Sequence, residues 1–145
     1  MQHTVRDVLK TKGDEVWSIT PQATVFEALV LMAEKNVGAL LVLDDGGLAG
    51  IFSERDYARK VILHGKSSKT TMVGELMTRE VIGARPDDSV EHCMAVMTSN
   101  RIRHMPVFED ASLIGVVSIG DVVRQVIAGH EFTIRELENY IRGSY

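Results

Sequence analysis

The chain contains one unit twice, because residues 16–62 align without a gap to residues 81–127 at a constant offset of 65. Thirteen of the 47 aligned positions are identical, where average residue usage predicts roughly three by chance. A duplicated unit is expected to fold as a pseudo-symmetric pair, in which any site on the axis occurs in two related versions. Each copy is near the size at which a separate core is marginal, so we expect the two copies to share one buried face.

The composition limits the classes of partner and compartment. Hydrophobic residues make up 45%, the net charge is -4, and Lys and Arg form no dense run, which argues against nucleic-acid and membrane partners. The sequence has neither a signal-peptide pattern at its start nor an apolar stretch long enough to cross a bilayer. Cys93 is the only cysteine and is expected to be a small buried residue of a helix. A reducing, cytoplasmic location is therefore predicted.

Each copy is predicted to be a β-α-β-β-α unit, giving an α/β (α+β) fold of two units packed through their sheets. Thr24 and Ser89 are the expected N-caps of the first helices. The expected strands are residues 16–19, 39–43 and 48–52 in the first copy and 81–84, 105–108 and 113–117 in the second. The second helices are expected to open at Ser53 and Ser118 and to run to about residues 63 and 128.

Short helical segments are expected outside the two copies. Residues 73–77 echo residues 5–9, which predicts a short helical lead-in before each copy, and residues 64–71 are predicted to be a loop. Gly129 is expected to end a helix, and residues 131–142 are expected to form a final amphipathic helix that either covers the core or holds a dimer. The predicted divisions are therefore unit 1 at 5–64, unit 2 at 65–128 and a C-terminal helix at 129–145.

The strongest local signal is a motif that closes the last strand of each copy, GIFSERD at 50–56 and GVVSIGD at 115–121. In one interpretation Ser53 with Asp56, and Ser118 with Asp121, are simple capping boxes of the helices that follow. In the other, the helix N-terminus and the Ser hydroxyl bind a phosphate, while the Asp accepts hydrogen bonds from ribose hydroxyls. The motif alone favours the capping interpretation.

Cationic residues near this motif differ between the copies. Arg103 and His104 stand where the first copy has Gly38 and Ala39, so the second copy alone has a candidate phosphate grip at a helix–strand junction. Two further candidates for phosphate binding are Arg55, opposite Gly120, and Arg85, opposite Thr20. The alternative for each of these side chains is an ordinary solvated surface position.

Signals for catalysis are weak. No His–acid pair lies near Ser53 or Ser118 in sequence, and no two histidines have the spacing of metal ligands. Neither of the common glycine-rich phosphate motifs, G-x-x-x-x-G-K-[ST] and G-x-G-x-x-G, is present. We therefore expect neither an enzyme nor a metal site.

Taken together, residues 5–128 resemble a tandem pair of CBS domains (cystathionine β-synthase domains) of the small stand-alone bacterial type. The resemblance rests on the two β-α-β-β-α units, the Gly-x-x-Ser-x-x-Asp ending of both copies, and the Arg-His-Met-Pro-Val segment at 103–107. It implies two clefts between the units that bind adenosyl ligands as regulators: AMP, ADP, ATP, S-adenosylmethionine or NAD(H). It also implies a homodimer, with no obligatory cofactor.

The resemblance also assigns roles to individual positions. It places Asp56 and Asp121 on ribose, Ser53 and Ser118 on phosphate, and Arg103 and His104 on phosphate from the facing unit. Around adenine it places Thr20, Gly38, Ala39 and Leu40 in one cleft and Arg85, Met105 and Pro106 in the other. Ile119 and Gly120, where copy one has Glu54 and Arg55, leave more room near Asp121. The cleft of Asp121 is therefore predicted to be the tighter site, with Arg55 able to approach a phosphate there.

Three hypotheses about function follow from the sequence. The first is a regulatory module whose conformation or partner binding changes when an adenosyl ligand binds, acting on an unknown regulated protein. The second is a dimerisation or adaptor module that works without nucleotide, in which the Ser-x-x-Asp motifs are only helix caps. The third, and least favoured, is a free-standing enzyme that acts on a nucleotide.

Overall fold

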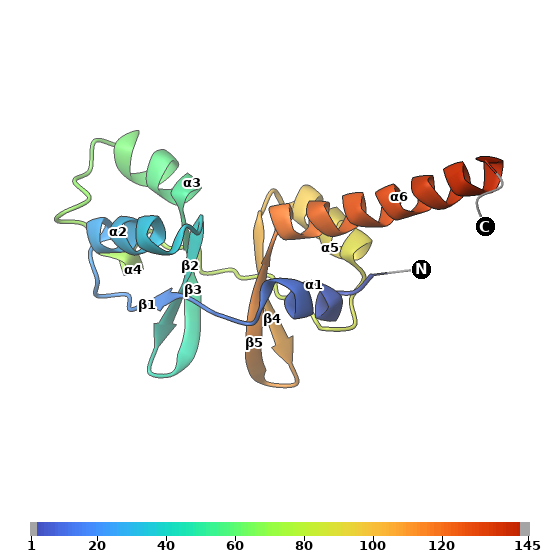
Figure 1. The fold of residues 1–145 in the computed structure, drawn as a ribbon. Helices are drawn as coiled ribbons and strands as arrows, with labels where there is room; N and C mark the ends of the chain where they lie inside the picture. Colours follow the sequence, from blue (N-terminus) through green and yellow to red (C-terminus); the bar gives the residue numbers. More distant parts are fainter. Residues whose placement is uncertain (1–2, 143–145) are drawn as a thin grey trace. The chain divides into compact units, whose positions relative to one another are not determined.

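The computed structural model describes residues 3–142, which form two compact units. The copy-one unit consists of residues 15–82. The copy-two unit combines residues 83–142 with the N-terminal residues 3–14. The chain therefore starts in the copy-two unit, leaves it after Asp14 and returns at Gly83 (Figure 1).

The copy-one unit is a three-stranded sheet with helical segments packed on it. The first strand is parallel to the second, and the second and third form an antiparallel hairpin. Leu40, Val42 and Phe52 from the hairpin are buried against Val25 and Met32 of the helix between the strands. In chain order its elements are β1 (Ser18–Ile19), α2 (Val25–Lys35), β2 (Ala39–Asp44), β3 (Gly47–Ser53), α3 (Glu54–Asp56), the π-helical η1 (Tyr57–Ile62) and α4 (Val73–Leu76).

The copy-two unit has the same plan with one strand fewer. Its elements are α1 (Val5–Lys12), α5 (Val90–Asn100), β4 (His104–Glu109), β5 (Ser112–Ser118) and α6 (Ile119–Arg142). The predicted strand at 81–84 is wrong, because only a single bridge from Ala84 to Val107 forms there. Gly83 stands at the position of Ser18, and glycine is a poor strand former. Cys93 is buried in α5, as predicted.

The repeat in the sequence is confirmed element by element. The pairs α2 and α5, β2 and β4, and β3 and β5 begin and end 65 residues apart, and both hairpins have a register shift at the same point. Both first helices end at a left-handed residue, Asn36 with φ 55° and Arg101 with φ 54°. Both hairpin turns contain a left-handed aspartate, Asp45 and Asp110.

The two copies exchange their lead-in helices. In Figure 1 the blue α1 lies against β5 and α6 of the copy-two unit, although it precedes copy one in the sequence. Conversely, α4 precedes copy two but docks on copy one. The same backbone hydrogen bonds hold both: Val5 to Asp88 (2.9 Å) and Arg6 to Pro86 (2.9 Å) in one unit, and Val73 to Ala23 (2.8 Å) and Gly74 to Pro21 (2.9 Å) in the other. The spatial units therefore differ from the sequential division into 5–64 and 65–128.

The last helix is continuous, so the prediction that Gly129 ends a helix is wrong. α6 runs from Ile119 to Arg142 without a break, and Gly129 is not among the residues with positive φ. A glycine ends a helix when it takes the left-handed conformation; inside a helix it costs only about 0.5–1 kcal/mol, which its neighbours can offset. The predicted apolar positions of this segment, Phe132, Leu137, Tyr140 and Ile141, lie outside the side chains that the structure describes.

Replacing Gly129 by alanine is expected to raise the free energy of unfolding by about 0.5–1 kcal/mol, because alanine is the better helix former. The added Cβ has room, since the nearest atom, Nε2 of His3, would be 3.5 Å away. Thermal and urea unfolding of the variant and the parent protein measure the change. A lower unfolding temperature would mean that the side chain of His3 cannot accommodate the methyl group.

Candidate functional site

Both copies build the same junction between the last strand and the following helix. β3 ends at Ser53 and β5 at Ser118, and each helix starts at the next residue. The backbone N–H of Ile119 donates to the carbonyl of Arg103 (2.8 Å), and that of Glu54 donates to the carbonyl of Gly38 (3.0 Å). The antiparallel register places His104 opposite Ser118 and Ala39 opposite Ser53. Each unit thus brings the start of its second strand to its Ser-x-x-Asp motif.

In the copy-two unit, Asp121 is the centre of a network of charged hydrogen bonds. Its Oδ2 accepts from the backbone N–H of Ser118 (2.9 Å) and from Nζ of Lys12 (2.7 Å). Its Oδ1 accepts from Nη2 of Arg124 (2.7 Å). The residue is only 8% exposed. A nearly buried carboxylate therefore lies between two cationic side chains.

In both copies the Ser and Asp of the motif form the reciprocal hydrogen bonds of a capping box, which confirms the capping interpretation. Oγ of Ser118 accepts from the backbone N–H of Asp121 (3.1 Å), which completes the reciprocal pair of a capping box. Burial acts to raise the pKa of Asp121, but the hydrogen bonds from Lys12 and Ser118 and the charge of Lys12 outweigh it and lower that pKa below its ordinary value. The carboxylate is consequently ionised at neutral pH.

In the copy-one unit, Asp56 has a related but less cationic environment. Its Oδ2 accepts from the N–H and the hydroxyl of Ser53 (3.0 and 3.1 Å). Its Oδ1 accepts from the Thr78 hydroxyl (3.2 Å) and forms an ion pair with Nζ of Lys60 (3.1 Å). Lys60 lies one turn after Asp56 in the same run of helix, whereas Lys12 comes from the other end of the chain. The two carboxylates are therefore equivalent in the fold but differ in their cations.

His104 and Arg103 complete the copy-two junction. His104 is half-buried, and burial together with the charges of Lys12 and Arg103 lowers its pKa, despite the opposing effect of Asp121. A neutral His104 can donate one hydrogen bond and accept another at pH 7. Arg103 is exposed. The structure therefore brings Arg103 and His104 to Ser118 and Asp121 within one unit.

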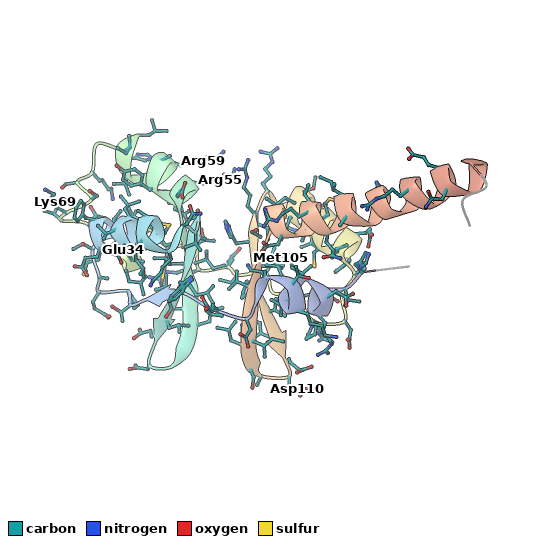
Figure 2. The ribbon with its side chains drawn as sticks, viewed as in Figure 1. Glu34, Arg55, Arg59, Lys69, Met105 and Asp110 are labelled. Carbon is teal, nitrogen blue, oxygen red and sulfur yellow. The ribbon has the colours of Figure 1, made fainter. Side chains whose placement is uncertain are left out.

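The remaining predicted residues lie at varied depths within their own units. Arg55 is half-buried at the start of the second helix of copy one, where Figure 2 shows it one turn from Arg59. Leu40 and Met105 are each 1% exposed, and Pro106 is buried beside Met105 in β4. The others are exposed or half-buried. Thr20 and Arg85 precede the first helices. Gly38 comes just before β2 and Ala39 begins it, while Ile119 and Gly120 lie in the first turn of α6.

Four polar side chains that contact the two aspartates were not among the predicted residues: Lys12, Lys60, Thr78 and Arg124. A signal did exist for Arg124, because it is identical to Arg59 in the repeat and lies one turn after the aspartate. Lys12 had no such signal. The residue at its position in the second lead-in is Glu80, so the repeat gives no reason to select it.

The CBS domain family model matches residues 4–62 and 73–128. The chain belongs to the CBS-domain family. A mitochondrial CBS domain-containing protein of Arabidopsis thaliana, CBSX3, is 48% identical over 98% of this chain and 73% of its own length. The structure of a CBS-domain protein from Burkholderia ambifaria, assigned to signal transduction, has 50% identity and a TM-score of 0.85 over 87% of this chain and 95% of that one.

A more distant structure shows a CBS protein in an assembly. A hexameric CBS-CP12 protein from bloom-forming cyanobacteria has 29% identity and a TM-score of 0.75, covering 85% of this chain and 71% of that one. CBS-domain proteins are commonly regulatory or signal-transduction modules. Within residues 3–142, none of the helices combines the length and apolar character that a membrane crossing requires.

Proposed function

We propose that this CBS protein is a regulatory module that binds an adenosyl ligand at the Ser118–Asp121 junction of the copy-two unit. AMP is the reference ligand, with ADP, ATP, S-adenosylmethionine and NAD(H) as members of the same class. Binding changes the conformation of the chain or its affinity for a regulated protein. The observation that carries the proposal is the nearly buried, ionised carboxylate of Asp121 between two cations at the start of a helix.

The chemistry of the junction matches the parts of a nucleotide. An ionised carboxylate only accepts hydrogen bonds, which suits the two hydroxyls of a ribose. The first turn of α6 and the hydroxyl of Ser118 suit a phosphate, because the helix dipole favours negative charge there and the hydroxyl can donate a hydrogen bond. Arg103, Arg124 and a neutral His104 supply further donors. Arg124 bonds to the carboxylate of Asp121 directly, and Arg103 and His104 lie at the strand start that is hydrogen-bonded to the beginning of α6.

The absence of a side chain at Gly120 favours this junction over its copy-one counterpart. A Cβ at Gly120 would lie 3.4 Å from Nη1 of Arg124 and 3.6 Å from Oγ of Ser118, so glycine leaves the space between these two groups open. Copy one has Arg55 at this position and Glu54 before it. An acidic residue in the first turn repels a phosphate that approaches the helix end. We therefore assign the tighter site to Asp121 and a weaker one to Asp56.

The chain is also proposed to form a homodimer. α6 exposes Val123 (38%) and Ile127 (49%) one turn apart, and the end of the second helix of copy one exposes Ile62 and Leu63. Exposed apolar residues that cluster on helices are typical of interaction surfaces. The hexameric relative shows that a chain of this fold can assemble. If the junctions bind no nucleotide, these exposed residues of either unit support the alternative function, that of a dimerisation or adaptor module.

Two further predictions belong to this proposal. We propose that the chain is not an enzyme, since its described junctions supply hydrogen-bond donors and a carboxylate already engaged as a helix cap. The cytoplasmic location stays a prediction from the single cysteine, and the relative with 48% identity is a mitochondrial protein.

Calorimetric titration of nucleotide-free protein with AMP, ATP, NADH and S-adenosylmethionine tests the proposed function. Saturable binding of AMP is expected, and Asp121→Asn should weaken it at least about tenfold, because a hydrogen bond to a charged group contributes about 1.5–3 kcal/mol. Asp56→Asn is the matched control and should leave the tighter site unchanged. A folded protein that binds none of the four ligands would support the adaptor function. If wild type and Asp121→Asn bind AMP equally well, the Ser118–Asp121 motif is only a helix cap.

A further inference from the structure

The ion pair between Lys12 and Asp121 joins the start of the chain to the proposed nucleotide site. The two residues are 109 positions apart, and Nζ of Lys12 lies 2.7 Å from Oδ2 of Asp121. The same ammonium donates to the backbone carbonyl of Val116 in β5 (2.8 Å). The side chain of Lys12 is 33% exposed and that of Asp121 is 7% exposed. Lys12 thus ties the end of the N-terminal helix to both Asp121 and β5.

The position of Lys12 in α1 makes its side-chain bonds, to Asp121 and to Val116, the last attachments of the lead-in helix. The first turn of α1 is held by the backbone bonds of Val5 and Arg6, and Leu9 packs on Gly115. Lys12 is the final residue of α1, and Gly13, with φ 94°, ends the helix. The chain leaves the copy-two unit two residues after Lys12. The side chain of Lys12 therefore links the carboxylate of Asp121 to the segment that leads into the copy-one unit.

The hydrogen-bonding capacity of Asp121 is limited. A carboxylate oxygen accepts about two hydrogen bonds, and Oδ2 already accepts two, from the N–H of Ser118 and from Lys12. A ribose diol has its hydroxyls on adjacent carbons, so a two-point contact uses both carboxylate oxygens. The Ser118 bond belongs to the backbone cap of α6 and stays in place. The ammonium of Lys12 is the partner that has to leave Oδ2.

We propose that Lys12 is a ligand-displaced latch: binding of a ribose diol at Asp121 releases Lys12 and frees the last turn of α1. This inference rests on the proposed function, because it needs an adenosyl ligand at Asp121. The displaced ammonium and the freed turn carry the occupancy of the site to the segment that joins the two units. Copy one lacks the charged version of this device, since its exchanged segment contributes only the neutral hydroxyl of Thr78 to Asp56.

Adenosine is the probe that isolates the diol, because it carries the ribose but no phosphate that Lys12 could attract. Lys12→Met keeps the apolar stem and removes the competing ammonium, so it should tighten adenosine binding by about three- to tenfold. Lys10→Met is the matched control, since Lys10 is an exposed cation of the same helix and should leave the affinity unchanged. In the wild type, saturating adenosine should speed hydrogen exchange of the backbone amides in the last turn of α1. In Lys12→Met these amides should exchange fast without ligand.

The outcomes separate the latch from the proposed function. If wild-type protein binds adenosine or AMP but Lys12→Met binds adenosine no more tightly, the latch is overturned and the nucleotide site stands. Unchanged exchange of the α1 amides on binding also overturns the latch, and this measurement needs no variant. If neither adenosine nor AMP binds the folded wild type, the proposed function and the latch fail together.

Discussion

Replacing Gly50 by alanine is expected to lower the free energy of unfolding by about 3 kcal/mol, a cost typical of severe overpacking. A Cβ at this position would lie 2.5 Å from the backbone oxygen of Thr78 and 3.0 Å from Sδ of Met77. The backbone cannot move aside cheaply, because Ile51 and Thr78 exchange two hydrogen bonds at this point (2.9 and 2.8 Å). The exchanged lead-in of copy two would have to detach from β3. Urea unfolding measures the loss.

Gly115→Ala tests whether the backbone contact of Thr78 causes the loss, since Gly115 is the position of copy two that is equivalent to Gly50. Its added Cβ would lie 2.7 Å from Cδ2 of Leu9, the end of a flexible side chain, so a rotamer change can relieve the contact. The expected loss is about 1 kcal/mol. Gly47→Ala, in the same strand as Gly50, meets only an atom 3.6 Å away and should be nearly neutral. Equal losses for Gly50→Ala and Gly115→Ala would show that the backbone contact of Thr78 is not decisive.

The repeat made the local structure predictable. A constant offset without gaps means that any turn or cap read in one copy applies to the other, and Thr24 and Ser89 both cap their helices as predicted. The failures occur where a single residue breaks the equivalence. Gly83 in place of Ser18 removes a strand, and Gly129 lies in a helix whose continuation outweighs its cost. The repeat pattern cannot show whether the cost of a single glycine is offset by the packing of the residues around it.

The exchange of lead-in helices shows a different limit. Residues 5–9 and 73–77 were paired by their sequence likeness, which predicts two equivalent helices but not the copy on which each one docks. Docking is decided by long-range backbone bonds, such as Val5 to Asp88 and Val73 to Ala23, and these leave no periodic pattern. The sequence did not predict the role of Lys12 for the same reason, namely that a long-range contact leaves no periodic pattern. Its role depends on an aspartate 109 residues away that only the exchanged fold brings near.

The two interpretations of the Ser-x-x-Asp motif turn out to share their geometry. Asp56 and Asp121 both make the bonds of a capping box, so capping accounts for the motif in each copy. Capping does not require the two cations at Asp121, because the box is complete with Ser118 alone. The difference between the copies therefore lies in the side chains added around the cap. At Asp121 they lower the pKa of a nearly buried carboxylate, and the proposed function depends on that ionised carboxylate.

The charge of Asp121 is expected to stabilise the protein at neutral pH but not in acid. Asp121→Asn should lower the free energy of unfolding by about 2 kcal/mol at pH 7. Asn offers one acceptor oxygen and an NH2 group with two donors in place of two acceptor oxygens, so Arg124, Lys12 or the N–H of Ser118 has to face an NH2 group. This value is smaller than for a fully buried ion pair, since the side chain of Arg124 is 73% exposed and solvent screens it.

The dependence on pH follows from the direction of the pKa shift. The pKa of Asp121 is lowered in the folded protein from its ordinary value of 3.8, so the unfolded chain binds the proton first as the pH falls. The stabilisation is fully present above the unfolded pKa and disappears as the pH falls through the lower folded pKa. The difference in unfolding temperature between wild type and Asp121→Asn should therefore be constant from pH 7 to about 5 and shrink below about 4.

The comparison with Asp121→Asn at each pH is needed because other groups titrate in the same range. The pKa of Asp7 is also lowered, mainly by its hydrogen bond from the N–H of Thr4, and this group is present in both proteins. Its contribution to acid unfolding therefore cancels in the difference. A difference that stays constant down to pH 3 would mean that the asparagine acts through its shape rather than through the lost charge. In that case Lys12 would not depend on the ionised carboxylate for its position, and the latch would lose its electrostatic basis.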